Sequence, residues 1–72
     1  MSILADRLKE CRKNKNKTQK DVADYLGITE CGYQNYEIRR REPKIETLNK
    51  LADYFDVSID YLTGRSDNPK RQ

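Results

Sequence analysis

Residues 18–37, TQKDVADYLGITECGYQNYE, contain the start and stop signals of two short helices joined by a tight turn. Thr18 is placed to cap the first helix, and Asp21 three residues later completes a variant of the capping box. Gly27 suits the left-handed residue just past a helix end, and Thr29 can cap a second helix immediately afterwards. Because only about three residues separate the two helices, they must cross steeply.

The apolar residues of this stretch give each helix a face to bury. Val22, Ala23 and Leu26 follow a helical spacing, and Ala23 supplies the small side chain that a steep crossing requires. Ile28 is placed to pack against Tyr33 as a hydrophobic staple. Residues 18–37 therefore predict a helix-turn-helix.

A helical pattern precedes this motif. Ser2 can cap a helix in which Leu4, Leu8 and Cys11 form an inward stripe and which ends near residue 13 or 14. Asn16 is then expected in the left-handed conformation, which asparagine tolerates better than most residues other than glycine.

Two more helical patterns follow a polar loop at residues 38–44. The fourth helix is predicted from the most regular apolar stripe in the chain, formed by Ile45, Leu48, Leu51, Ala52 and Phe55. Ser58 can cap a last short helix over residues 59–63, and Gly64 can end it. Since no strand pattern is present, the sequence predicts an all-α fold.

Length and composition indicate one small folded domain. The chain has 72 residues, of which 35% are hydrophobic and 38% charged, so its core is small. No apolar run is long enough to span a membrane and no signal peptide opens the sequence, which predicts a cytoplasmic protein. Histidine, glycine-rich phosphate loops and nucleophile–base pairs are absent, and Cys11 and Cys31 make neither a usual zinc site nor an expected disulfide. The sequence therefore predicts no enzyme and no metal, cofactor or small-molecule site.

The distribution of charge is more informative than the net charge of +3. Basic residues gather at positions 12–20 and 39–44, whereas Asp53, Asp56 and Asp60 lie in the later helices. This separation predicts one basic and one acidic side. A charge cluster taken alone is more often a solvated surface without a partner, so both interpretations stay open.

Five segments of the chain share the spacing of one known class: residues 18–29 (TQKDVADYLGIT), 36–37, 41–43, 46–48 and 57–65 (VSIDYLTGR). In these segments the chain resembles the lambda-repressor-like (Cro/Xre) class of DNA-binding domains, and the resemblance covers about residues 3–65. It departs from the class at Lys17, where leucine is usual, at Arg39, where glycine is usual, and at Cys31 and Gly32 inside the second helix of the motif.

The resemblance implies that one set of residues contacts the bases and another set contacts the phosphates. The second helix of such a motif lies in the DNA major groove, and its outward side chains here are the candidate base contacts: Glu30, Cys31, Gln34 and Asn35. Asn35 can pair with adenine, and Glu30 can accept from cytosine or simply favour the helix start. Gly32 either allows close approach to DNA or is merely tolerated.

The candidate phosphate contacts surround that helix, and they are Lys17, Gln19, Lys20, Thr29, Arg39, Arg40 and Arg41. In the class, the position of Gln19 is a phosphate clamp at the amino end of a helix. The positions of Arg12 and Glu37 often form a structural ion pair between the first helix and the end of the recognition helix.

Together these features predict a compact five-helix lambda-repressor-like bundle, with a DNA-binding domain at residues 1–64 and a polar tail at residues 65–72. The expected function is transcriptional regulation, with repression favoured, by binding double-stranded DNA, with two copies on a palindromic operator. Candidate surfaces for a homodimer are Tyr54, Ile59, Tyr61 and the tail. The alternative is an antitoxin-like or other protein-interaction module on the same fold.

Overall fold

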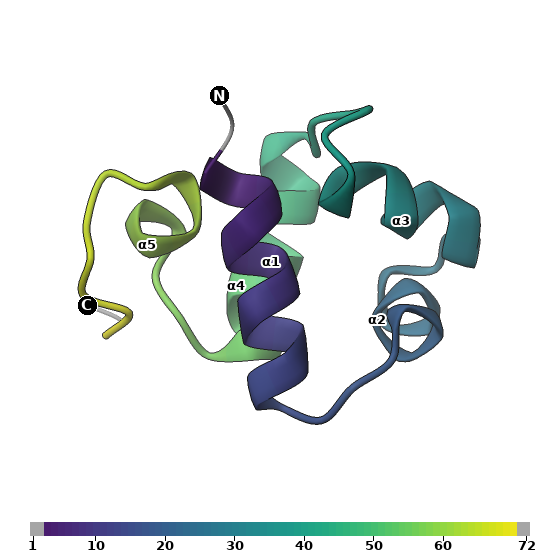
Figure 1. The fold of residues 1–72 in the computed structure, drawn as a ribbon, viewed down its shortest axis with the longest axis horizontal. Helices are drawn as coiled ribbons and strands as arrows, with labels where there is room; N and C mark the ends of the chain where they lie inside the picture. Colours follow the sequence, from purple (N-terminus) through teal and green to yellow (C-terminus); the bar gives the residue numbers. More distant parts are fainter. Residues whose placement is uncertain (1–2, 71–72) are drawn as a thin grey trace.

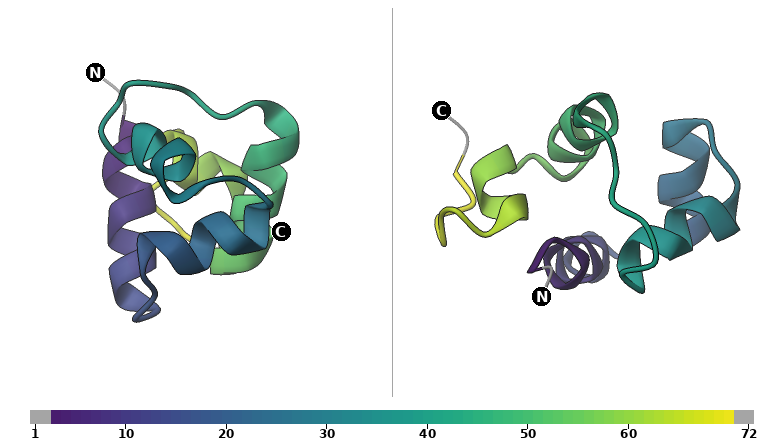
Figure 2. Two further views of the ribbon diagram at one scale, coloured as in Figure 1. Left: turned by 90° about the vertical axis from the view of Figure 1, so that its right-hand side faces the viewer. Right: turned by 90° about the horizontal axis from the view of Figure 1, so that it is seen from above.

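The computed structural model describes residues 3–70 and contains five α-helices with no strand in that range. The helices are α1 (Ile3–Asn14), α2 (Gln19–Leu26), α3 (Glu30–Glu37), α4 (Ile45–Phe55) and α5 (Ile59–Thr63). Figures 1 and 2 show α2 and α3 at one end of the molecule, α5 at the other, and α1 and α4 between them. The predicted all-α, five-helix architecture is confirmed, while the predicted Ser2 cap lies outside the described residues.

Local hydrogen bonds set the ends of the two helices in the motif. The Thr18 hydroxyl accepts from the Asp21 amide at 3.0 Å, and the Asp21 carboxylate accepts from the Thr18 amide at 2.9 Å, which completes the capping box. Gly27 ends α2 with φ 74°, and the Thr29 hydroxyl caps α3 through the Gly32 amide at 3.0 Å. The helix starts and the helix end predicted within residues 18–37 are therefore confirmed.

Left-handed backbone conformations occur at three described residues other than glycine. Asn16 has φ 56°, as predicted, and Asp56 has the same value at the end of α4. Arg39 has φ 65° at the position where the resembled class usually has glycine. The chain thus keeps the backbone bend there without the residue type that adopts it most easily.

Each helix contributes at least one side chain with no exposed surface to the core. These are Leu8, Val22, Tyr33, Leu51 and Leu62, each with 0% of its surface exposed. Since every helix contributes to one cluster, the arrangement of α2 and α3 depends on the whole domain.

The predicted apolar stripe of α4 is only partly correct. Leu51, Ala52 and Phe55 are buried, but Leu48 is half-buried and Ile45 is 63% exposed. Ile45 and Leu48 belong to the first turn, beside the loop at residues 38–44, whereas the later turns carry the buried positions. The prediction that Leu48 is a core residue is therefore wrong.

The segment predicted as a polar tail folds back onto the domain. Over residues 65–70 it forms no helix or strand, but the Pro69 carbonyl accepts from the Ser58 amide at 3.0 Å. Asp67 accepts from Arg7 of α1 at 2.9 Å. Figure 1 shows this segment beside α5.

Tyr61 is not a candidate dimer surface, contrary to the prediction. It is 9% exposed, its hydroxyl donates to Glu10 of α1 at 3.1 Å, and the Arg7 guanidinium lies 3.9 Å from its ring centroid. These contacts use the side chain to join α5 to α1.

Candidate nucleic-acid interface

The helix α3 has one buried and one exposed face. Tyr33 is fully buried and Glu37, one turn later, is 4% exposed. Among the candidate base contacts, Glu30, Cys31 and Gln34 are exposed and Asn35 is half-buried. By the helical period, Cys31, Gln34 and Asn35 lie off the face that Tyr33 buries, whereas Glu30, three residues before Tyr33, lies nearer that face in the exposed first turn.

Gly32 has a local structural role inside α3. A β-carbon at this position would lie 3.1 Å from the Thr29 hydroxyl oxygen and 3.7 Å from the Ile28 side chain. That oxygen is the cap that accepts from the Gly32 amide. A side chain at Gly32 would therefore crowd the contact that starts the helix.

The candidate phosphate contacts differ in whether their side chains already form ion pairs within the domain. Arg40, Arg41 and Lys17 are exposed, and Lys20 pairs with Asp24 at 3.0 Å on the surface of α2. Arg39 donates to both carboxylate oxygens of Asp6 at 2.8 and 2.9 Å. A phosphate contact by Arg39 would have to compete with this pair.

Glu37 is the centre of a buried polar cluster. Its side chain is 0% exposed, and it accepts from Arg12 Nε at 2.8 Å and from Arg12 Nη2 at 3.2 Å. Gln19 Nε2 donates to the same carboxylate at 3.2 Å. The Tyr33 hydroxyl is buried in the same region without a well-formed hydrogen bond inside the described range. The structure therefore contains the predicted Arg12–Glu37 pair and adds Gln19 to it.

Electrostatics favour the ionised form of Glu37. Burial raises the pKa of Glu37, but the polar groups of Arg12, Tyr33 and Gln19 outweigh burial and hold this pKa below its ordinary value. The pKa of Arg12 is raised, chiefly by its hydrogen bond to Glu37. Burial, with the nearby Glu37, raises the pKa of Tyr33. The cluster therefore holds a carboxylate and a guanidinium as charged partners at neutral pH.

Sequence reasoning missed the contacts of Gln19 with Glu37 and of Arg39 with Asp6. Their partners are 18 and 33 residues apart in the chain, so no local spacing signals them. Arg39 in place of the usual glycine indicated an unusual site but not its partner.

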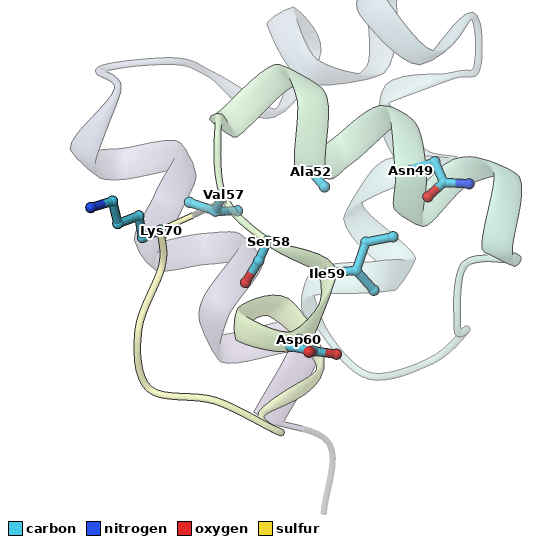
Figure 3. A pocket seen from close by; sticks show the side chains of 7 residues that line it. All are labelled: Asn49, Ala52, Val57, Ser58, Ile59, Asp60 and Lys70. Carbon is cyan, nitrogen blue, oxygen red and sulfur yellow. The ribbon is translucent and has the colours of Figure 1, made fainter. Parts of the chain in front are cut away.

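Two hollows in the described part of the chain have no lining residue from α3. One, of about 260 Å³, lies between α4 and α5 (Figure 3) and is lined by Asn49, Ala52, Val57, Ser58, Ile59, Asp60 and Lys70. Across residues 3–70, no group of three or more histidine, cysteine or acidic residues is placed to hold a metal ion. No described helix is both long enough and apolar enough to cross a membrane.

The sequence matches a family of known regulators. The profile of the helix-turn-helix family matches residues 8–62. The regulator YqaE of Bacillus subtilis, named an HTH-type transcriptional regulator, is 44% identical over 94% of this chain. The phage CTXphi transcriptional repressor RstR of Vibrio cholerae is 44% identical over 86% of it. The chain spans only 59% and 55% of the lengths of these two relatives.

Two solved structures have the same fold. A transcriptional regulator from Listeria innocua superposes with a TM-score of 0.80 and 31% identity, over 85% of this chain and 57% of that one. The P22 c2 repressor, solved with a synthetic operator, has a TM-score of 0.83 over 92% of this chain and 100% of its own, at 23% identity. With the family match over residues 8–62 and the relative at 44% identity, the chain belongs to the Cro/Xre-type helix-turn-helix family.

Proposed function

We propose that this protein is a transcriptional regulator that binds double-stranded DNA sequence-specifically by placing α3 in the major groove. The observation that carries this proposal is the exposed polar face of α3, formed by Glu30, Cys31 and Gln34 and bordered by the half-buried Asn35. An α-helix fits the major groove, where each base pair presents a distinct pattern of donors and acceptors. Family membership and the relatives named as regulators support the same function.

The proposal assigns separate tasks to the surrounding side chains. Asn35 and Gln34 are the proposed amide contacts to base edges, whereas the exposed Arg40 and Arg41 follow α3 and are the proposed phosphate contacts. The amino end of α2, at Gln19, offers backbone N–H groups without intrahelical acceptors. Lys17, Lys20 and Thr29 complete the proposed phosphate contacts.

Three further statements belong to this proposal. Residues 1–64 form the DNA-binding domain, two copies bind a palindromic operator, and the protein acts in the cytoplasm without catalysing a reaction. Two copies are proposed because one α3 reads only a half-site. With Tyr61 buried, the exposed surface of the α4–α5 end is the remaining candidate for contact between copies.

Selection of bound sequences from a random DNA pool, followed by affinity measurements at several salt concentrations, tests the function. We expect enrichment of one motif and an affinity that falls steeply as salt rises, because phosphate binding releases counterions. Failure to enrich any motif, together with capture of a protein in the absence of DNA, would support the interaction-module alternative instead.

A further inference from the structure

The carboxylate of Glu37 fixes the orientation of the Gln19 side-chain amide. A carboxylate can only accept hydrogen bonds, so the nitrogen end of the amide must face it, as the 3.2 Å contact from Gln19 Nε2 shows. The oxygen end would be repelled by the negative charge. Because the Glu37 side chain is 0% exposed, water does not compete for this contact.

The amide held in this way lies at the start of α2. Gln19 is the first residue of α2, directly after the Thr18 cap, where backbone N–H groups have no intrahelical acceptor. Its Nε2 carries two hydrogens, and Glu37 uses one of them. The half-buried side chain keeps part of its surface accessible. The second hydrogen can therefore be donated to an anion that also meets the helix terminus.

We propose that Glu37 is a positioning residue for DNA binding, which holds the Gln19 amide so that its second N–H is presented to a DNA phosphate. This inference rests on the proposed function. Glu37 is the last residue of α3, and the Gln19 amide that it orients is the proposed phosphate contact at the start of α2. One carboxylate therefore connects the helix proposed to read bases with the residue proposed to fix the position of that helix on DNA. Arg12 has a different task, since it neutralises the same carboxylate from α1.

The first test needs no DNA and no substitution. Side-chain amide hydrogen exchange, followed by NMR in the unaltered protein, compares Gln19 with the exposed Gln34 as a matched control. We expect one Nε2 hydrogen of Gln19 to exchange at least about tenfold more slowly than those of Gln34, because it is held by a buried acceptor. Equal exchange at both residues would overturn the inference.

The second test measures DNA affinity in three backgrounds. Gln19→Met keeps the side-chain length but removes the donor, and it should weaken binding about tenfold in the unaltered chain, as expected for a hydrogen bond to a charged group. In the Glu37→Gln background, where the amide is no longer oriented, the same substitution should cost less than about twofold. In the Arg12→Lys background, a positive charge stays beside the Glu37 carboxylate, so the loss should stay near tenfold.

These backgrounds separate positioning from a purely structural role, in which Arg12→Lys and Glu37→Gln would change the Gln19→Met factor alike. An equal factor in all three would overturn the inference. Arg40→Ala serves as the control, because its loss of affinity should be the same in every background. If the unaltered chain showed no affinity for DNA, the proposed function would fail with the inference, whereas an intact Arg40 effect with equal Gln19 factors would refute the inference alone.

Discussion

At the scale of the residue, the backbone conformations that most side chains disfavour occur just after helices end. Asn16, Arg39 and Asp56 all have positive φ, within two residues of the ends of α1, α3 and α4. Asparagine and aspartate adopt this conformation at low cost because their short polar side chains bond locally, but arginine has no such compensation. At Arg39, the ion pair with Asp6 holds the side chain across to α1.

Asn16 gives a direct test of this backbone requirement. Asn16→Gly should leave the free energy of unfolding unchanged or slightly raised, because glycine adopts φ 56° without strain. Asn16→Val should lower it by about 1–2 kcal/mol, the cost of a left-handed conformation for a residue with a full side chain. Urea denaturation measures both, and equal effects of glycine and valine would contradict the assignment.

Burial separates two leucines of α4 that look equivalent in sequence. Leu51→Ala should cost about 2–5 kcal/mol of stability, because the side chain is fully buried and its removal leaves a cavity. Leu48→Ala should cost clearly less, since Leu48 is half-buried. Equal losses in chemical denaturation would show that the first turn of α4 belongs to the core.

At the scale of the element, the Arg12–Glu37 pair joins α3 to α1. Glu37→Gln should destabilise the domain by about 3–5 kcal/mol, because it leaves a largely buried guanidinium without its charged partner. The double variant with Arg12→Gln should lose less than the sum of the single losses. The exposed Arg39–Asp6 pair is the matched control, where Asp6→Asn should cost at most about 1 kcal/mol. If the loss in the double variant equalled the sum of the two single losses, Arg12 and Glu37 would have no energetic coupling.

The same pair predicts how stability depends on pH. The pKa of Glu37 is lower in the folded chain than its ordinary value of 4.5, so its contribution is fully present above that value. As the pH falls below 4.5 and through the lower folded pKa, the contribution is lost. The unaltered chain should therefore lose more stability on acidification than Glu37→Gln does. Thermal unfolding at a series of pH values measures the difference, and parallel curves would contradict it.

The elements also show what sequence could and could not predict. Thr18, Gly27 and Thr29 act through hydrogen bonds to near neighbours, so their caps follow from local spacing. The orientation of the Gln19 amide and the burial of Tyr61 depend on residues 18 and 51 positions away, and local patterns contain no information on them. The exposure of Ile45 likewise depends on where neighbouring elements cover α4, which its regular stripe does not indicate.

At the scale of the whole molecule, the proposed DNA-binding helices and the C-terminal elements lie at opposite ends (Figure 1). The helices α2 and α3 occupy one end, and α5 with residues 65–70 occupies the other (Figure 1). Exposed Asp53, Asp56 and Asp60 lie in α4, at its end and in α5, whereas the exposed Arg40 and Arg41 follow α3 in the chain. If the proposed function holds, binding through α3 brings Arg40 and Arg41 toward phosphates.

A comparison of Asn35→Ala with Arg40→Ala, on preferred and random DNA over a range of salt, tests the proposal that α3 reads base edges while its surroundings bind phosphate. Arg40→Ala should weaken binding to both DNAs and reduce the slope of log affinity against log salt by about one phosphate contact. Asn35→Ala should lose about 1–3 kcal/mol on the preferred site, lose little on random DNA, keep the salt slope and relax the preference at one base pair, expected to be A·T. A folded Asn35→Ala chain with undiminished discrimination at every position of the preferred site would contradict the claim.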